Sequence, residues 1–334
     1  MIFNDLPQKE RLELYQEVHD KNGLSKIIIE KDWWVTTVLR ALFSLPYAEH
    51  LSFKGGTSLS KCWNLIERFS EDVDIAVNRE YLGFVGTLSK TQISDRLRRA
   101  ACSFVREKLQ FDLSKQLENN GLNPNDYTVK VNVTPISTTD PEIIEVEYDS
   151  LFVEENYIKR KVIVEVSGRS MNEPLQPVTL QSMIDEEFPN EEFTENPFEV
   201  QAVIPQRTFI EKICLLHEEF AKPQDLMRTE RMSRHLYDLV QIIDTPIADK
   251  AMTDKYLCNS VVEHRRIFVG LKGFDYSTLA PKTINIVPPD HIIDLWKADY
   301  ETMQRTMIYG NSLPFSKLIE KIKELNERIN EVKW

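Results

Sequence analysis

The sequence lacks long apolar runs and has few cysteines, and these two shortages exclude several classes of protein. A membrane-spanning helix needs about 20 consecutive apolar residues, and no such run occurs. The first residues lack a basic start followed by an apolar stretch, so we expect no secretory signal. The four cysteines in 334 residues have no CxxC spacing, which argues against a zinc ribbon or a disulfide framework and favours a reducing compartment. We therefore expect a cytoplasmic protein with no membrane partner.

The chain also lacks an excess of positive charge. Lys and Arg number 41 against 53 Asp and Glu, a net charge of −12. Bulk electrostatic coating of nucleic acid is thereby excluded, because it requires a basic surface. A local basic groove stays open, although basic clusters on helices are commonly solvated faces. The candidates form two sets: Arg207, Arg228, Arg231 and Arg234, and separately Arg96, Arg98, Arg99 and Arg106.

Length and periodicity predict two domains. The fold class that we expect is α/β (α+β), a mixed sheet flanked by helices and followed by a C-terminal helical domain that closes the active-site cleft. We place the domains at residues 1–195 and 196–334, and we expect residues 170–196, rich in proline and acids, to form a loop-rich connection. Helices are expected at 25–43, 57–69 and 89–117, and strands at 51–54 and 72–77 and in the runs that begin at Tyr127, Glu142 and Lys159.

A double-glycine turn in the segment FKGGTS is the first candidate functional feature. Gly55 and Gly56 end a predicted strand and precede a predicted helix that starts near Thr57. Paired glycines allow the backbone to approach a ligand, and a helix N-terminus attracts phosphate. The alternative is a tight turn that uses glycine for its geometry alone.

A pair of carboxylates follows in the segment DVDIAV. Asp72 and Asp74 are two residues apart on a predicted strand, so both project from one face. Hard divalent cations prefer such oxygen ligands, and metal pairs serve phosphoryl chemistry. A third ligand is expected at Glu165, the acid in an apolar run, because a buried carboxylate is costly unless paired or metal-bound. Glu145 and Glu147 compete, but their regular alternation is more typical of a solvated sheet face. The alternative for the aspartates is a half-exposed strand.

These motifs resemble the nucleotidyltransferase superfamily of the DNA polymerase β and minimal nucleotidyltransferase kind. The wider pattern looks like the AbiEii/AbiGii toxin family from about residue 25 to past residue 300. The similarity is most specific around residues 53–75. The matching segments are Glu30–Trp33, Phe53–Lys61, Arg68–Ile75, and the later blocks RTFIEKICLLH and SRHLYDL.

The resemblance implies a magnesium-dependent enzyme, with two Mg²⁺ ions, that moves a nucleoside monophosphate from an NTP to an acceptor hydroxyl. It further implies the toxin of a toxin–antitoxin or phage-defence system, with a cognate antitoxin and RNA, such as tRNA, as acceptor. The implied catalytic residues are Asp72, Asp74, Glu165, Lys212 and Asp238, the first three of them as metal ligands. The implied nucleotide-binding residues are Gly55, Gly56, Thr57, Ser58, Lys61, Lys212 and Arg234.

The two later motif residues have alternatives. Lys212 flanks the apolar stripe of its predicted helix, where it could reach a phosphate or extend to water. Asp238 lies off the stripe of the next helix and could face a cleft or form a surface ion pair with Arg234. His217 and His235 are expected to be structural or exposed. Trp33 and Trp34 are expected in the core.

Two rival functions remain open from the sequence. One is a protein-nucleotidylating enzyme with the same metal site, since that site determines the donor chemistry better than the acceptor. The other is a non-catalytic module that kept the fold and binds a partner. The complete set of glycines and acids argues against the second rival.

Overall fold

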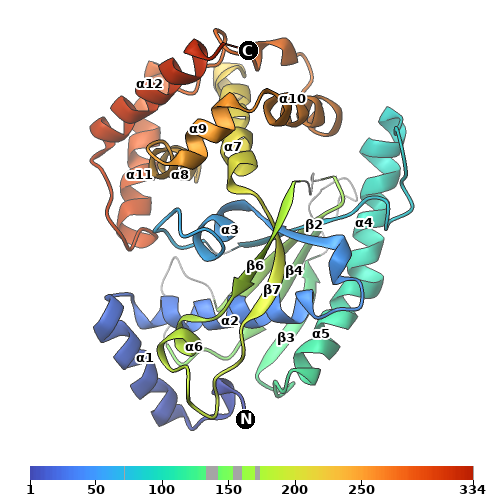
Figure 1. Cartoon of the computed structure of the whole chain (residues 1–334), viewed down its shortest axis with the longest axis vertical. Coiled ribbons are helices and arrows are strands. Elements are labelled where there is room, and N and C mark those ends of the chain that lie inside the picture. The colour runs from blue at the N-terminus through green and yellow to red at the C-terminus, as the bar shows by residue number, and fades with distance from the viewer. Residues whose placement is uncertain (71, 133–141, 153–159, 170–173, 334) are drawn as a thin grey trace. The chain divides into compact units, whose positions relative to one another are not determined.

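The computed structural model describes residues 1–70, 72–132, 142–152, 160–169 and 174–333 (Figure 1). The chain divides into two compact units. The first, an α/β unit, comprises Met1–Cys62 and Ser70–Val203. The second, a helical unit, comprises Ile204–Trp334 and also the short segment Trp63–Phe69. Within the described residues, none of the helices is both long and apolar enough to span a membrane.

The α/β unit is built on a seven-stranded mixed sheet in the order β3-β4-β5-β2-β1-β7-β6. Two neighbouring pairs are parallel, β2 with β5 and β1 with β7, and the other pairs are antiparallel. A mixed sheet with helices and a helical C-terminal part confirms the predicted fold class. The strands are β1 (Leu51–Lys54), β2 (Asp72–Val77), β3 (Tyr127–Asn132), β4 (Glu142–Tyr148), β5 (Lys161–Ser167), β6 (Leu175–Leu180) and β7 (Phe198–Val203).

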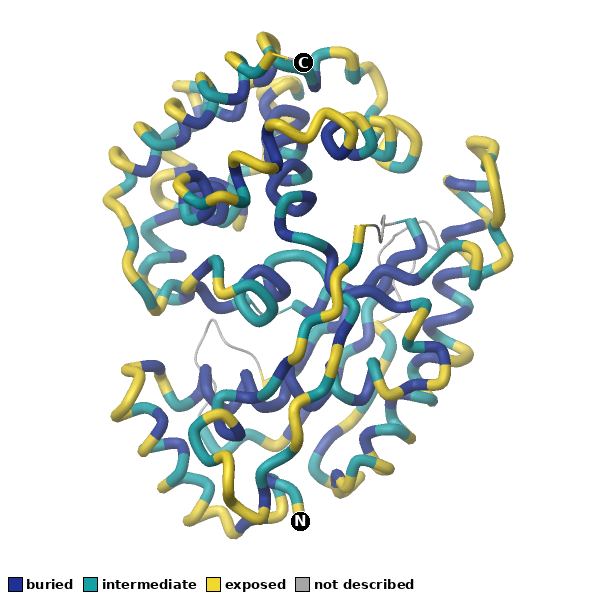
Figure 2. Tube along the Cα trace, viewed as in Figure 1, coloured by how far each residue is buried: buried dark blue, intermediate teal, exposed yellow. Residues whose placement is uncertain are grey.

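The central strands have one apolar and one polar face. Val73 and Ile75 of β2 are buried, as are Val164 and Val166 of β5. The alternate positions of these two strands are mainly polar, with Ala76 and Ile163 as apolar exceptions. Helix α2 (Lys26–Phe43) packs on the apolar face, where Trp34 stacks on a tyrosine of β4. Trp33 and Trp34 are core residues, as predicted, and the burial of α2 along its length can be followed in Figure 2.

The other helices of the α/β unit are α1 (Gln8–Asn22), α3 (Gly55–Lys61), α4 (Arg98–Phe104), α5 (Gln110–Asn119) and α6 (Met183–Glu187). The helical unit contains α7 (Pro205–Phe220), α8 (Ser233–Ile242), α9 (Pro246–Thr253), α10 (Lys255–His264), α11 (Ile293–Thr306) and α12 (Phe315–Glu331). Helix α8 packs against α7, α11 and α12, so it is enclosed on more than its apolar stripe.

Two predictions about local structure are wrong. The helix expected over 57–69 ends at Lys61, and Asn64 adopts a left-handed conformation with φ of 50°. The chain there leaves the helix to join the helical unit. The connection expected over 170–196 contains β6, and β7 follows it. Strand β6 includes Pro177 and pairs only at the end of the sheet order, a position that tolerates the missing N–H of proline.

Candidate active site

Register places the predicted carboxylates on one face of the sheet. Asp74 of β2 and Glu165 of β5 are direct partners across a parallel pair, so their Cα atoms are about 4.8 Å apart. Asp72 is two residues before Asp74 and therefore shares that face. This is the polar face, opposite to α2, and three acids meet there from two adjacent strands.

Gly55 makes room for one of these acids. It has φ of +78°, a conformation that L side chains rarely adopt. A Cβ atom at Gly55 would lie 1.8 Å from Oδ2 of Asp74, closer than two non-bonded atoms can approach. The first glycine of the predicted phosphate turn thus permits both the turn and the position of the Asp74 carboxylate.

The carboxylates of Asp72, Asp74 and Glu165 suit a hard divalent cation, because they are oxygen donors and lie on the same face of the sheet. Three carboxylates on one face repel each other unless positive charge lies near them, and oxygen donors suit Mg²⁺. Among the described residues, however, no three His, Cys, Asp or Glu side chains are gathered closely enough to hold a metal ion. A bound cation would therefore have to draw these three carboxylates together.

Two predicted nucleotide-binding hydroxyls are engaged with the backbone. The Thr57 hydroxyl donates to the carbonyl of Asp72, and the Ser58 hydroxyl donates to the carbonyl of Gly55 at 2.9 Å. Both side chains are buried. Thr57 thereby joins the first turn of α3 to the start of β2, and a contribution of these hydroxyls to nucleotide binding stays a prediction.

Lys61, also predicted to bind nucleotide, forms an ion pair with Asp32 of α2. The second carboxylate oxygen of Asp32 accepts the backbone N–H of Met183, the first residue of α6, at 2.9 Å. Glu30, on the same helix, accepts hydrogen bonds from Ser150 and from the backbone of Leu151. The acidic residues of the Glu30–Trp33 motif therefore join α2 to its neighbours, and from the sequence only a role in charge pairing could be expected for them.

Lys212 and Asp238 meet in the helical unit, together with Arg68. Arg68 donates through Nε and Nη2 to the two carboxylate oxygens of Asp238, at 2.6 and 2.8 Å. The Nζ atom of Lys212 lies 2.8 Å from Oδ2 of the same carboxylate. The side chains of Arg68 and Asp238 are 2% and 0% exposed, and that of Lys212 is 9% exposed. The surface pair considered between Asp238 and Arg234 is wrong, because this carboxylate is fully buried.

Burial and charge shift the pKa values of this cluster in opposite senses. Burial alone would raise the pKa of Asp238, but the charges of Arg68 and Lys212 outweigh burial and hold that pKa well below its ordinary value. Burial lowers the pKa of Lys212, and the Asp238 carboxylate opposes this shift. The pKa of His235 also falls well below its ordinary value, through burial and through the nearby charges of Lys212 and Arg234. Arg234 therefore lies close to the cluster, half-buried on α8.

Two arginines of the first candidate basic set, Arg207 and Arg228, are paired with acids. Arg207 is fully buried and donates to Glu211 at 2.8 Å. Arg228 donates through its backbone and its guanidinium group to Glu219. The proposal of a patch that includes Arg207 is therefore wrong.

Acids also lie beside three arginines of the second candidate set. Arg98 is 4% exposed, and it lies with Arg99 beside Asp95. Arg106 donates to Glu142 at 2.7 Å. Asp95 lies about one helical turn from Arg98 and Arg99, whereas Glu142 comes from β4. Acids beside these arginines lower the net positive charge of both sets.

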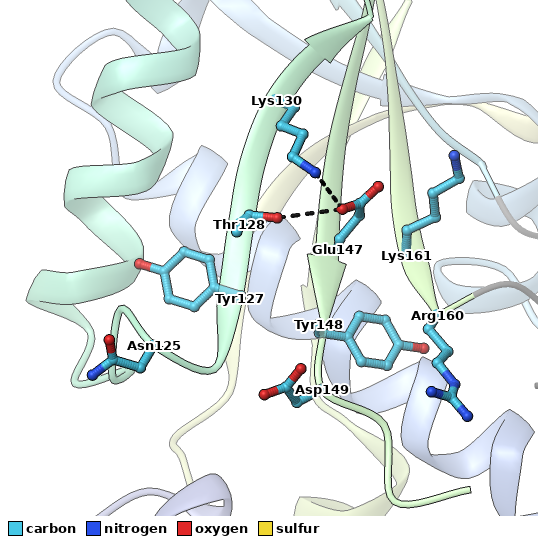
Figure 3. A pocket seen from close by; sticks show the side chains of 9 residues that line it. All are labelled: Asn125, Tyr127, Thr128, Lys130, Glu147, Tyr148, Asp149, Arg160 and Lys161. Atoms are coloured by element: carbon cyan, nitrogen blue, oxygen red, sulfur yellow. Dashed lines mark hydrogen bonds and ion pairs between the residues drawn. The ribbon is translucent and has the colours of Figure 1, made fainter. Parts of the chain in front are cut away.

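A pocket of about 500 Å³ lies over β3, β4 and the start of β5 (Figure 3). Lys130 pairs with Glu147 at 2.6 Å, and both project from the face that carries the acids of β2 and β5. Three cations and two acids line the pocket, so its charge is nearly balanced. Its lining residues are Asn125, Tyr127, Thr128, Lys130, Glu147, Tyr148, Asp149, Arg160 and Lys161.

A family model for the nucleotidyl transferase AbiEii toxin of type IV toxin–antitoxin systems matches residues 37–323, most of the chain. The chain belongs to this AbiEii family. It is therefore a nucleotidyltransferase, and membership implies an antitoxin partner. The matched range includes the Gly55 turn, the carboxylates of β2 and β5, and both partners of the Lys212–Asp238 pair.

This AbiEii protein was also compared with curated proteins and with solved structures. No curated protein matches it. Among solved structures, JHP933 from Helicobacter pylori is 14% identical, with 92% of this chain and 94% of that one covered and a TM-score of 0.45. An H. pylori protein described as a candidate nucleotidyltransferase is also 14% identical, with 93% and 100% covered and a TM-score of 0.40.

Proposed function

We propose that this AbiEii protein is a magnesium-dependent enzyme that transfers a nucleoside monophosphate from an NTP to a hydroxyl group of RNA. The observation that carries the proposal is the pairing of Asp74 with Glu165 beside the Gly55 turn. In the reaction, the acceptor oxygen forms a bond to the α-phosphorus, and the bond from that phosphorus to the β-phosphate oxygen breaks. Pyrophosphate leaves, and the acceptor loses a proton.

Asp72, Asp74 and Glu165 would hold the divalent cations, two ions as the family resemblance implies. Bound magnesium would supply charge neutralisation on the triphosphate and a lower pKa for the acceptor hydroxyl. Gly55 leaves the Asp74 carboxylate the space that it needs. Lys212 would neutralise charge that develops on the phosphates, as a compact cation kept in place by Asp238.

The proposal is tested by incubating the protein with each labelled NTP, Mg²⁺ and total cellular RNA. We expect one NTP to label a defined RNA species. Asp74→Asn should abolish the labelling and leave the fold intact, because the amide has the same shape and relieves carboxylate repulsion. Loss of folding in this variant would instead mean that the carboxylate pair is structural.

The acceptor class is read from the same reaction. The resemblance to the AbiEii/AbiGii toxins supports RNA, and transfer to RNA should weaken steeply with added salt, because phosphate contacts release counterions. Label on protein in place of RNA would favour the protein-nucleotidylating alternative. The balanced charge of the pocket in Figure 3 does not by itself favour either acceptor.

Lys212 has a test of its own. Lys212→Met should lower kcat about 10²-fold, the usual cost of removing one charged group that stabilises a transition state. The matched control is Lys222→Met, which removes a lysine that pairs with Glu219 at 2.8 Å. Equal rates for the two variants would contradict the role of Lys212.

A further inference from the structure

The segment Trp63–Phe69 belongs to the helical unit, although it lies in sequence between two elements of the α/β unit. Helix α3 ends at Lys61, and β2 begins at Asp72. The chain therefore leaves the unit that carries the candidate metal ligands immediately before it supplies them.

Backbone hydrogen bonds anchor this segment inside the helical unit. The carbonyl of Glu67 accepts the N–H groups of Tyr309 and Gly310, at 3.0 and 3.3 Å. The N–H of Phe69 donates to the carbonyl of Met307 at 2.7 Å. A Cβ atom at Gly310 would lie 1.8 Å from the Glu67 carboxylate, so the two chain segments pack against each other without space for a side chain.

Arg68 adds a buried side-chain anchor at the same place. Its guanidinium group binds the Asp238 carboxylate through two parallel hydrogen bonds, and that carboxylate also binds Lys212. A bidentate pair of this kind fixes both the distance and the orientation of its partners. Because both side chains are buried, removing either one would leave the other with less compensating charge.

Within the α/β unit, a hydrogen bond from the Thr57 hydroxyl to the carbonyl of Asp72 joins the elements on the two sides of Trp63–Phe69. Thr57 thus holds the start of β2, and Arg68 holds the segment that precedes it in sequence. The position of Arg68 therefore constrains the strand that starts four residues later with Asp72.

We propose that Arg68 is a positioning residue for the metal carboxylates, and that Asp238, besides its ion pair with Lys212, contributes to this positioning by holding Arg68. The inference rests on the proposed function for its link to catalysis. Arg68 touches neither donor nor acceptor in this scheme. It sets the segment from which Asp72 and Asp74 emerge.

The test compares the Mg²⁺ dependence of transfer in Arg68→Met with that in the parent protein. We expect the half-saturating Mg²⁺ concentration to rise about tenfold, the effect typical of residues that orient metal ligands. A purely structural defect would lower the amount of active protein and leave this concentration unchanged.

The matched control is Arg265→Met. Arg265 forms a bidentate pair with Glu218 inside the same unit, with side chains 13% and 4% exposed. We expect this variant to lose stability and keep the parental Mg²⁺ dependence. Equal shifts in the two variants, or no shift in Arg68→Met, would overturn the proposal. If Arg68→Met does not fold, Arg68→Lys is measured in its place. A rise in the half-saturating Mg²⁺ concentration of less than about tenfold supports the proposal, and an unchanged concentration contradicts it.

The role of Asp238 is read from a double-mutant cycle. Asp238→Asn should shift the Mg²⁺ dependence in the same direction, and Arg68→Lys/Asp238→Asn should be no worse than the more severe single variant, because both act through one pair. Additive shifts would show that Asp238 acts independently of Arg68.

A metal-binding measurement separates this inference from the proposed function. Titration with Mn²⁺ alone, followed by electron paramagnetic resonance, needs no nucleotide. Absence of transfer with every NTP would refute the proposed function. Weaker Mn²⁺ binding in Arg68→Met than in Arg265→Met would still support Arg68 as a positioning residue, and equal binding would refute it.

Discussion

Gly55 and Asp74 show how a motif can be specified by two residues that are distant in sequence. The glycine is required by its left-handed backbone and by the carboxylate that occupies the place of its Cβ atom. The turn and the acid would therefore fail together if either were changed in size.

Gly55→Ala should lose stability and activity, and Gly23→Ala is its matched control. Gly23 has nearly the same φ, +74°, but nothing lies within 4 Å of an added Cβ atom. We expect Gly23→Ala to cost about 1–2 kcal/mol of unfolding free energy from backbone strain alone. Gly55→Ala should cost more and should also lower kcat, because the Asp74 carboxylate must move. Urea unfolding and transfer assays measure both effects, and equal costs at the two positions would contradict the close contact.

At the scale of elements, α2 carries buried charged side chains that bind neighbouring elements. Asp32 binds Lys61 of α3 and the backbone N–H of the first residue of α6, and Glu30 binds the residues that follow β4. Burial raises the pKa of Glu30, and the hydrogen bonds from Ser150 and Leu151 oppose that shift. The helix is thus joined to three neighbours by charge as well as by its apolar surface.

Lys61→Met tests whether this lysine stabilises the fold through its ion pair with Asp32 or binds the nucleotide. The side chains of Lys61 and Asp32 are 12% and 8% exposed, so we expect a loss of about 3–5 kcal/mol in unfolding free energy. Adding Asp32→Asn should recover part of the loss, because the unpaired charge is removed. The control Lys130→Met breaks an exposed pair and should cost less than about 1 kcal/mol. A raised KM for NTP with unchanged stability would favour the nucleotide role.

The hydrogen-bond partners of His217, on α7, determine which tautomer its neutral ring adopts. Its Nδ1 accepts the backbone N–H of Asn285 at 2.9 Å, so the neutral ring carries its proton on Nε2, which lies 2.9 Å from the Thr278 hydroxyl. Burial lowers the pKa of His217 below its ordinary value of 6.5. The ring is therefore structural, which is one of the two outcomes expected for it from the sequence.

Acidification should destabilise the protein in part through His217. Between its folded pKa and 6.5, the unfolded chain binds the proton and the folded chain does not, so stability is lost as the pH falls below about 6.5. His217→Asn keeps an acceptor near the Asn285 N–H and removes the titration. Urea unfolding at about pH 7.5 and about pH 5.5 should show a smaller pH effect in this variant. An unchanged pH effect would rule out His217 as a source.

At the scale of the whole molecule, the chain passes between the two units three times. A cut at Val203 would separate Trp63–Phe69 from the helices that enclose it. The helical unit is therefore not a contiguous piece of sequence, and its stability depends on a peptide that the N-terminal half supplies.

A fragment of residues 204–334 should fold poorly by itself. It would lack Arg68, leaving Asp238 with Lys212 alone in a buried site, at a cost on the order of 3–5 kcal/mol. A synthetic peptide of residues 60–72 should raise its thermal midpoint, and the same peptide with Arg68→Met should do so less. Cooperative unfolding of the fragment at the stability of the intact chain would contradict the discontinuous unit.

The sequence predicted much of the α/β unit because its signals are local. Alternation in DVDIAV and KVIVEVS identified β2 and β5, and apolar periodicity identified α2 and α7. The prediction of a helix over 57–69 was wrong because the tertiary contacts of Trp63–Phe69 override the helical periodicity of its sequence. Strand β6 was missed because proline and exposed positions conceal a strand at the end of a sheet.

Chemical type and spacing, which are properties of the sequence itself, determined the carboxylate pair, the glycine turn and the family. Tertiary structure alone decided the partners of charged side chains. Arg68 and Asp238 are 170 residues apart, and Asp32 and Lys61 are on different helices. A charge can be buried only beside a compensating charge, and folding brings that partner from anywhere in the chain. For this reason the sequence indicated the candidate charged residues. Only the tertiary structure distinguished the acids on the face of the sheet from the buried ion pairs that join one element to another.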